Sequence, residues 1–331
     1  MDMNTLRSVA GIYRHTRRWF DSKKFIEVRT NAFGSAPGFD GYVAPFSAAY
    51  SPPGGQARRL FLSSSPEFEM KRLAFAGADR IFQVCRAFRN AEHDLTHRPE
   101  FDMLEWYSTG TGYRDAMRQT EDLVRHVSRK AGGRGEFVVH SRSVPLGKSF
   151  ERIKVRDVFL EMTGIDLCLV QEREDFLEAA RRLGITHIRQ TASWDTVFFI
   201  LFLDKVEAGL ARIDKPVILC DYPVQLASLA RTVPDDPRFV ERFEISIQGL
   251  ELCNGYSELT DRAGHSQRLE LVNSQRRQEG FEPLAFPGDF LASLPEKAGK
   301  LSGVALGMDR LAMLVTGQDD IGGIVPFDPF M

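Results

Sequence analysis

The chain has 331 residues, 43% of them apolar, which is enough to build a large core in one or two domains. Its net charge of −2 lacks the basic bias of a dedicated nucleic-acid binder. The N-terminus has no apolar signal segment, and no apolar run approaches the length of a membrane span. The four cysteines show neither CxxC spacing nor a histidine cluster, which argues against disulfides and a zinc site. These features predict a cytoplasmic protein that does not enter a membrane.

Apolar periodicity and turn residues predict the secondary structure. In chain order, the first half has a helix over 5–20 with Asn4 as its N-cap, a strand over 25–29, loops around one short strand over 34–58, a helix over 67–76 that stops at Gly77, strands over 81–88 and 101–107, and a helix over 114–130. The second half has helices over 151–163 and 172–183, a strand over 217–220, strands over 239–247 and 250–256 joined by a turn at Gln248-Gly249, a helix over 263–278, and a glycine-rich strand that leads into a helix over 309–315.

Hairpin-linked strands dominate both ends of the chain, and helices lie between them. This order is typical of an α+β fold with an antiparallel sheet. Nothing repeats at a fixed period, and no low-complexity linker divides the sequence. We therefore expect one domain over residues 1–331, with a helical insertion at about 145–215.

Two distant stretches carry the residues that point to chemistry. The first contains Phe88-Arg89-Asn90 and His97-Arg98-Pro99-Glu100-Phe101, and the second is Gly303-Val304-Ala305-Leu306-Gly307-Met308-Asp309-Arg310. Each offers an arginine, the side chain that best matches phosphate oxygens. The first adds an aromatic ring that can stack on a base, and the second adds glycines that let backbone approach a ligand. Together they predict a nucleotide site on an antiparallel sheet.

These stretches resemble motifs 2 and 3 of the class II aminoacyl-tRNA synthetases, and most closely their lysine branch. Ser65-Pro66-Glu67 with Met70-Lys71-Arg72-Leu73 is similar to the substrate-binding helix of that branch. Phe243-Glu244, Glu251, Asn254-Gly255 and Ser257-Glu258-Leu259 are similar to its metal-binding and lysine-binding hairpin. The resemblance covers nearly the whole chain and implies a six-stranded antiparallel sheet flanked by helices.

One part of the lysyl-tRNA synthetases has no counterpart in this prediction. Those enzymes carry an anticodon-binding barrel before the catalytic domain, and here the first predicted helix begins at about residue 5. We therefore expect no anticodon-binding domain. This layout, together with Trp106 and Ala305, is similar to the elongation factor P lysine ligases, paralogues that transfer a lysyl group to a lysine of a translation factor.

The resemblance implies ATP-dependent activation of lysine or β-lysine, with Mg²⁺ as cofactor and Arg89 and Arg310 as catalytic residues. The implied ATP-binding residues are Arg89, Asn90, His97, Phe101, Glu251, Leu252, Gly307 and Arg310. The implied metal ligands are Glu244 and Glu251. The implied lysine-binding residues are Ser65, Pro66, Glu67, Glu105, Tyr107, Asn254, Glu258 and Ala305.

Strand alternation adds an argument from the residues themselves. It places Phe101, Met103, Glu105 and Tyr107 on one face of a strand, so adenine stacking and amine binding can share one surface. Glu105 is equally compatible with a buried structural acceptor. Ala305 is one methyl group larger than the glycine usual in the synthetases, and the choice between lysine and β-lysine stays open.

Two positions depart from the class II pattern. Asn31 stands where motif 1 normally has a proline, and Ala91 stands where motif 2 normally has a glutamate, with Glu92 following. The expected partners are elongation factor P as acceptor and a second copy of the chain in a homodimer, and tRNA is not expected. Two alternatives remain: a minimal lysyl-tRNA synthetase that acts on tRNA, and a non-catalytic regulator that binds an amino acid or nucleotide.

Overall fold

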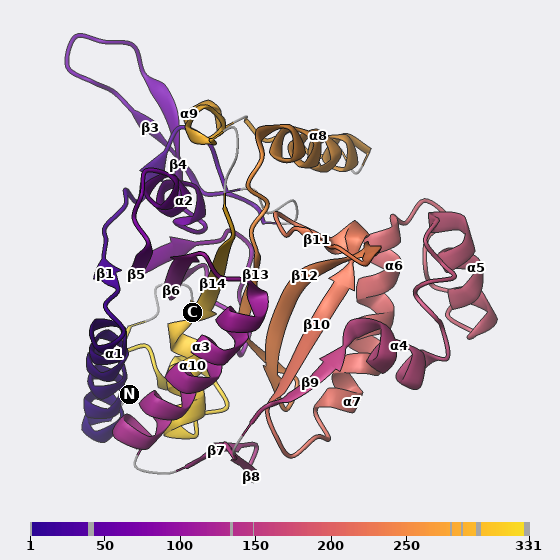
Figure 1. Ribbon diagram of the computed structural model, residues 1–331, viewed down its shortest axis with the longest axis horizontal. Coiled ribbons are helices and arrows are strands. Elements are labelled where there is room, and N and C mark those ends of the chain that lie inside the picture. Colours follow the sequence, from indigo (N-terminus) through magenta and orange to yellow (C-terminus); the bar gives the residue numbers. More distant parts are fainter. Residues whose placement is uncertain are drawn as a thin grey trace.

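The computed structural model describes residues 2–38, 43–132, 135–147, 149–278, 280–285, 287–295 and 299–327. Within these residues a large sheet runs through the molecule (Figure 1). Its strands are β1 (Ile26–Glu27), β5 (Arg80–Phe88), β6 (Glu100–Thr109), β9 (Glu151–Lys154), β10 (Val217–Pro223), β11 (Thr232–Val233), β12 (Asp236–Ile247), β13 (Leu250–Ser257) and β14 (Leu301–Gly307). Their order is β1-β5-β6-β14-β13-β12-β10-β9, and β11 pairs with β12.

The middle of the sheet is antiparallel throughout. Every pairing from β5 across to β10 is antiparallel, so these six strands form the predicted sheet and the α+β class is confirmed. The edge strands β1 and β9 add to it in parallel. The prediction of a helix from residue 151 was wrong for residues 151–154, because the edge of β10 offers free backbone groups that β9 pairs with.

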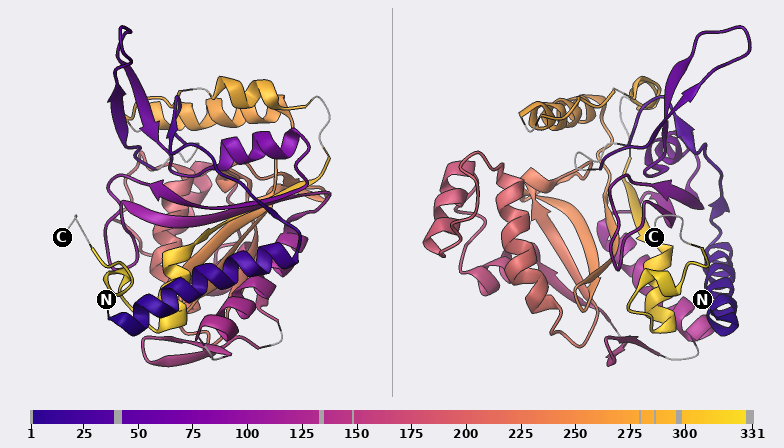
Figure 2. Two further views of the ribbon diagram at one scale, coloured as in Figure 1. Left: turned by 90° about the vertical axis from the view of Figure 1, so that its left-hand side faces the viewer. Right: turned by 180° about the vertical axis from the view of Figure 1, so that it is seen from behind.

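Helices cover both faces of the sheet. One face carries α1 (Met3–Ser22), α3 (Tyr113–Val127), which continues as a π-helical turn over Ser128–Gly132, and α10 (Met308–Thr316). Near the other face lie α2 (Glu67–Phe75), α8 (Arg262–Gln278) and α9 (Gly288–Ser293). Figure 2 shows α1 crossing on one side of the long strands, with α2 and α8 on the opposite side. Each of these helices except the short α9 was predicted within a few residues.

The chain between β9 and β10 is helical and packs on the β10–β12 end of the sheet (Figure 1). Its helices are α4 (Val155–Thr163), α5 (Arg173–Arg182), α6 (Trp194–Leu201), a π-helical segment over Phe202–Glu207, and α7 (Ala208–Leu210). Phe159, Phe176 and Phe198 are fully buried there, and they belong to one continuous apolar cluster with Val217 and Leu219 of β10.

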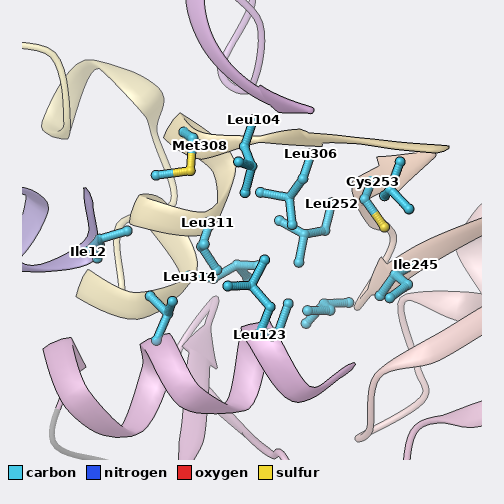
Figure 3. Packing of buried hydrophobic residues seen from close by; sticks show 14 of the residues in the cluster. Ile12, Leu104, Leu123, Ile245, Leu252, Cys253, Leu306, Met308, Leu311 and Leu314 are labelled. Atoms are coloured by element: carbon cyan, nitrogen blue, oxygen red, sulfur yellow. The ribbon is translucent and has the colours of Figure 1, made fainter. Parts of the chain in front are cut away.

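The main core lies between the sheet and helices α1, α3 and α10. Leu104 of β6 and Leu306 of β14 are buried on this side and face Leu311 of α10 and Leu123 of α3 (Figure 3). Because side chains alternate along a strand, the neighbouring residues of β6 must point to the opposite face of the sheet. This alternation separates an apolar core from the surface on which the polar candidate residues stand.

Two local predictions need correction. Asp2, not Asn4, is the N-cap of α1, because its carboxylate accepts the backbone N–H groups of Asn4 and Thr5 at 2.7 and 2.9 Å. Residues 33–62 form a small sheet with three strands, β2 (Phe33–Gly34), β3 (Ser47–Tyr50) and β4 (Arg58–Leu62), in place of one short strand among loops. Weak, exposed strands of this kind depend on pairing partners that the local pattern does not reveal. Residues 39–42 of that predicted loop lie outside the described residues.

The hairpin between β12 and β13 is confirmed. Gln248 and Gly249 both have positive φ, 50° and 86°, as a tight two-residue hairpin turn requires. A second hairpin, β7 (Glu136–Val139) with β8 (Arg142–Pro145), was not predicted. The four cysteines are free, and no helix among the described residues has the length and apolar character needed to cross a membrane.

Candidate active site

A cavity of about 1250 Å³ lies on the face of the sheet opposite the main core. Phe101, Met103, Glu105 and Tyr107 of β6 all line it, which confirms the prediction from strand alternation. Strands β12, β13 and β14, the start of α2, the loop after β5 and the start of α10 supply the other lining residues used below. The two distant arginine stretches of the sequence therefore meet in one cavity.

Arg89 stands just beyond the end of β5 and lines the cavity. Its backbone N–H donates to the Pro99 carbonyl at 2.8 Å, and its guanidinium lies 5.3 Å from the centre of the Phe101 ring. Its Nε has no hydrogen-bond partner among the described residues. Ala91 has a left-handed backbone (φ 66°), and Glu92 after it lies 3.9 Å from the guanidinium. Glu92 therefore lines the cavity beside Arg89.

Arg310, in the first turn of α10, is held by three contacts. It donates to the carbonyls of Glu251 and Thr96 at 2.7 and 3.3 Å, and its Nη2 lies 2.5 Å from His97 Nε2. Because a guanidinium only donates, His97 Nε2 accepts, and His97 Nδ1 carries the proton that faces Asp94 Oδ2 at 2.9 Å. This chain of contacts gives Arg310 a defined orientation before any ligand binds.

Gly307 and Leu252 border the same end of the cavity. The three atoms nearest to a Cβ at Gly307 would all belong to the Arg310 side chain, at 3.6 Å or more, so a methyl group would make ordinary contact there without a clash. The Leu252 side chain is 1% exposed and points into the main core beside Leu306 (Figure 3). Any contact between Leu252 and a nucleotide would therefore involve its backbone.

Glu244 and Glu251 face the cavity from the two strands of the hairpin. Both oxygens of Glu244 are held by protein donors, Oε1 by Arg242 at 2.7 Å and Oε2 by the Tyr222 hydroxyl at 2.5 Å. Glu251 is exposed by surface area but lies within the cavity, where reduced contact with water raises the pKa of its carboxyl, and the neighbouring charge of Glu244 raises it further. A divalent cation bound between these two carboxylates would offset the repulsion between their negative charges.

The carboxylate pair fits Mg²⁺ and not a metal ion that needs three or more protein ligands. Among the described residues, no group of three or more His, Cys, Asp or Glu side chains is placed to hold a metal ion. Mg²⁺ commonly takes one or two carboxylates and completes its shell with water and substrate phosphates. Glu244 and Glu251 therefore match a cation that arrives with a polyphosphate.

The other end of the cavity is acidic. Glu105 is 2% exposed and accepts hydrogen bonds from the Ser65 and Tyr107 hydroxyls at 2.5 and 3.0 Å. Burial, and then the nearby Glu67 charge, raises the pKa of Glu105 to about 7. Glu67 begins α2, where a carboxylate is favoured by the helix dipole, and its Oε1 accepts from the Tyr256 hydroxyl at 3.0 Å.

Glu67 and Glu258 share one buried cation, Lys71. Lys71 Nζ lies 2.6 Å from Glu67 Oε1 and 2.5 Å from Glu258 Oε2, and its side chain is fully buried. Burial alone would lower the pKa of Lys71, but Glu258 and Glu67 together raise it above its ordinary value. Burial raises the pKa of Glu258 to about 8 in spite of the Lys71 charge. Lys71 is therefore charged at neutral pH.

Ala305 and Asn254 lie between the two ends. In the sheet register Ala305 of β14 is opposite both Glu105 of β6 and Asn254 of β13, and all three line the cavity. Asn254 Oδ1 accepts from Arg242 Nε at 3.2 Å. The Ala305 methyl group thus stands beside the acidic end, where its size affects the available space.

Two of the predicted site residues do not line the cavity. Pro66 is the buried N-cap residue of α2, and it sets the start of the helix that carries Glu67. Asn90 forms a β-bridge with Ala44, to whose carbonyl its backbone N–H donates at 2.9 Å, and its side chain is exposed. In both cases the local backbone turns the residue away from the site.

Four residues of the site were missed. Arg242 and Tyr222 hold Glu244, Tyr256 binds Glu67, and Lys71 joins Glu67 to Glu258. Only Lys71 had a sequence signal, because it follows Glu67 by four residues in a predicted helix and such pairs meet on one face. Arg242 stands two residues before Glu244 on the same strand, β12. Tyr222 and Tyr256 come from β10 and β13, 22 and 189 positions from their partners.

Comparison with known proteins agrees with this geometry. Residues 2–329 match the family of class II tRNA synthetases (D, K and N). An elongation factor P–(R)-β-lysine ligase of Pectobacterium atrosepticum is 35% identical over 320 residues, 96% of this chain and 93% of the relative. Ligases of the same name from Vibrio atlanticus and Salmonella typhi are each 34% identical, over 328 and 320 residues, and cover 98% and 96% of this chain and 95% and 93% of the relatives. The chain belongs to the class II tRNA synthetase family (D, K and N), and within it the chain resembles the elongation factor P–(R)-β-lysine ligases.

Proposed function

We propose that this chain is an ATP-dependent ligase that activates (R)-β-lysine or lysine as an aminoacyl-adenylate and transfers the acyl group to a lysine ε-amine of elongation factor P. One observation carries the proposal: a single cavity has two arginines suited to phosphates at one end and three glutamates suited to amines at the other. The names of the relatives support the acceptor and favour (R)-β-lysine as the acyl donor.

The nucleotide end would act by position and charge. The substrate carboxylate attacks the α-phosphorus of ATP, and the bond to pyrophosphate breaks, so no protein nucleophile is needed. Arg89 would stabilise the charge on the α-phosphate and the attacking carboxylate. Arg310, with His97 beside it, would hold the terminal phosphate. Phe101 would stack on adenine, on the ring face that the Arg89 guanidinium leaves open.

Glu244 and Glu251 would hold the Mg²⁺ ion that accompanies ATP. When bound, the ion supplies positive charge that screens the triphosphate. Arg242 and Tyr222 keep Glu244 in place for this role, since each binds one of its oxygens. The backbone at Gly307 and Leu252 would lie along the nucleotide.

The acidic end would select a diamino acid. We propose that Glu67 receives the amine nearer the carboxylate and Glu258 the distal amine, with Glu105, Tyr107, Ser65 and Asn254 completing the wall. A neutral side chain would leave buried carboxylates unpaired, which disfavours other amino acids strongly. In the second step the acceptor amine attacks the acyl carbon, the bond to AMP breaks, and an amide forms.

The decisive experiment supplies enzyme, ATP and Mg²⁺ with radiolabelled (R)-β-lysine or lysine, and then with elongation factor P or total tRNA. The proposal expects label on the factor. Factor whose lysines have been acetylated should stay unlabelled, because its acceptor amines are blocked. Label on tRNA alone would indicate a minimal synthetase, and the absence of lysine-dependent exchange of pyrophosphate into ATP would indicate a binding protein without catalysis.

Two neighbouring residues give a matched pair of variants for this assay. Arg89→Ala removes the guanidinium that faces the cavity, and should abolish most of the exchange activity. Asn90→Ala alters an exposed side chain outside the cavity, and should leave exchange near the wild-type rate. Equal losses in both variants would mean that the loop after β5 contributes only to folding.

We also propose that the active protein is a homodimer that pairs through α1 and the strand after it. This region exposes apolar side chains, with Met3 60% and Leu6 42% exposed on α1 and Ile26 60% exposed on β1. Analytical ultracentrifugation should give the mass of two chains, and Ile26→Asp should give the mass of one. A monomeric wild-type protein would refute this part of the proposal.

A further inference from the structure

Lys71 is an ammonium group built into the wall of the acidic end. Its side chain is fully buried, and it touches two of the three glutamates there, Glu67 and Glu258. Nothing about packing demands a charge at this position. Replacing a buried ion pair by apolar side chains of similar volume is often neutral or stabilising, so a buried pair is weak evidence of a structural role. The charge of Lys71 therefore needs another explanation.

The charges around Lys71 can be counted. When two ammonium groups are bound, their charge favours the ionised forms of Glu67, Glu105 and Glu258, which sum to −3, and Lys71 brings the total to −2. His265 packs near Lys71, but burial lowers the pKa of its imidazole to about 4, so it is neutral. The Tyr107 and Tyr256 hydroxyls are also neutral, because burial raises the pKa of both well above the ordinary value. Arg242 lies at the other end, paired with Glu244.

We propose that Lys71 is a specificity-determining residue that sets the net charge of this end of the cavity at −2, to match a ligand with two ammonium groups. This inference rests on the proposed function for the ligand class and adds the reason for the charge match. Without Lys71 the end would hold three carboxylates for two amines. With a second lysine the acidic end would have a net charge of −1, which would match a ligand with one ammonium group.

The geometry gives Lys71 a second effect, which is to position the two glutamates. Glu67 Oε1 is occupied by Lys71 and Tyr256, while its Oε2 makes no hydrogen bond within the described part of the chain. Glu258 Oε1 lies close to Gly303, where a Cβ atom would come within 2.3 Å of it. Lys71 thus fixes which oxygens remain for a ligand.

The test uses 1,5-diaminopentane, which has two ammonium groups and no carboxylate, so it binds without being activated. Isothermal titration calorimetry without ATP should show the diamine binding to wild-type protein at least tenfold more tightly than pentylamine, which has one ammonium group. Equal binding of the two amines, or no binding of the diamine at millimolar concentration, would overturn the inference.

Three variants then separate charge matching from direct contact. Glu258→Gln leaves a net charge of −1, Lys71→Met leaves −3, and the double variant K71M/E258Q restores −2. Charge matching predicts that the double variant binds the diamine at least fivefold more tightly than Glu258→Gln, although it differs from wild type at two positions. A double variant no better than Glu258→Gln would refute the role of Lys71.

The design also allows for a variant that does not fold. Lys71→Met leaves Glu258 buried without a countercharge, and if this variant is insoluble, the comparison of the double variant with Glu258→Gln still decides the question. The outcome is independent of catalysis. Failure of pyrophosphate exchange in wild-type protein would refute the proposed ligase, whereas only the amine titrations bear on Lys71.

Discussion

Gly303 offers a sharp prediction about how tightly the acidic end is built. An alanine Cβ at this position of β14 would lie 2.3 Å from Glu258 Oε1 and 2.4 Å from Tyr107 Cε1. Real Cβ contacts are essentially never below 3.0 Å. Neither neighbour can yield freely, because Lys71 holds Glu258 at 2.5 Å and the Tyr107 hydroxyl donates to Glu105 at 3.0 Å. Gly303→Ala must therefore displace the ion pair, the ring, or the strand.

The expected magnitude follows from that constraint. Inserting a methyl group into a well-packed interior costs about 1–3 kcal/mol. We expect the upper end, about 3 kcal/mol, because the displaced group belongs to a buried ion pair whose disruption is itself costly. Urea unfolding followed by circular dichroism measures the change. Titration with lysine should also show affinity reduced at least tenfold, since Glu258 and Tyr107 both line the cavity.

Gly307→Ala, four residues along, is the matched control. The three atoms nearest to its Cβ would all belong to the flexible Arg310 side chain, at 3.6 Å or more, and Gly307 has φ −72°, which any residue adopts. The change in unfolding free energy should stay within about 0.5 kcal/mol, as for a substitution without a steric conflict. If both variants unfold alike, or if Gly303→Ala binds lysine as wild type does, the described packing around Glu258 is wrong.

Three further predictions concern the two ends of the cavity. Arg310→Ala should lower kcat/KM for ATP by roughly 10- to 100-fold, because it removes a charge-assisted phosphate contact of about 1.5–3 kcal/mol. Arg310→Lys should recover part of the loss. Unchanged ATP kinetics in Arg310→Ala would mean that the triphosphate lies elsewhere. The KM for lysine should fall as pH rises from about 6 to 8, because the pKa values of Glu105 and Glu258 are raised to about 7 and about 8, and only their ionised forms pair with ammonium groups. A KM that instead rises with pH would contradict the assignment. Because these carboxyls bind protons more tightly in the folded state than in the unfolded chain, they also contribute less to folding stability as pH rises through that range. Ala305→Gly should change the ratio of kcat/KM for lysine over β-lysine, and an identical ratio would remove Ala305 from the determinants of substrate choice.

Much of the fold and the site was available from the sequence, because it rests on local rules. Alternation along β6 placed Phe101, Glu105 and Tyr107 on one face without any coordinates, since successive side chains of a strand point to opposite sides. The turn at Gln248-Gly249 followed from the glycine between two apolar runs, because glycine tolerates positive φ. The motif residues around Arg89 and Arg310 pointed to the family, which the comparisons then established over residues 2–329.

The tertiary structure alone decided which residues meet and which charges are enclosed. The sequence places Lys71 in a helix four residues after Glu67, but only folding buries it between Glu67 and a glutamate 187 positions later along the chain. Tyr222 and Tyr256 meet Glu244 and Glu67 in the same way, and Asn90 is held outside the site by a bridge to Ala44. Residue type and spacing determine how each segment folds, because those forces act between near neighbours. Burial and Coulomb energy act between groups close in space, and their distances exist only once the strands have paired.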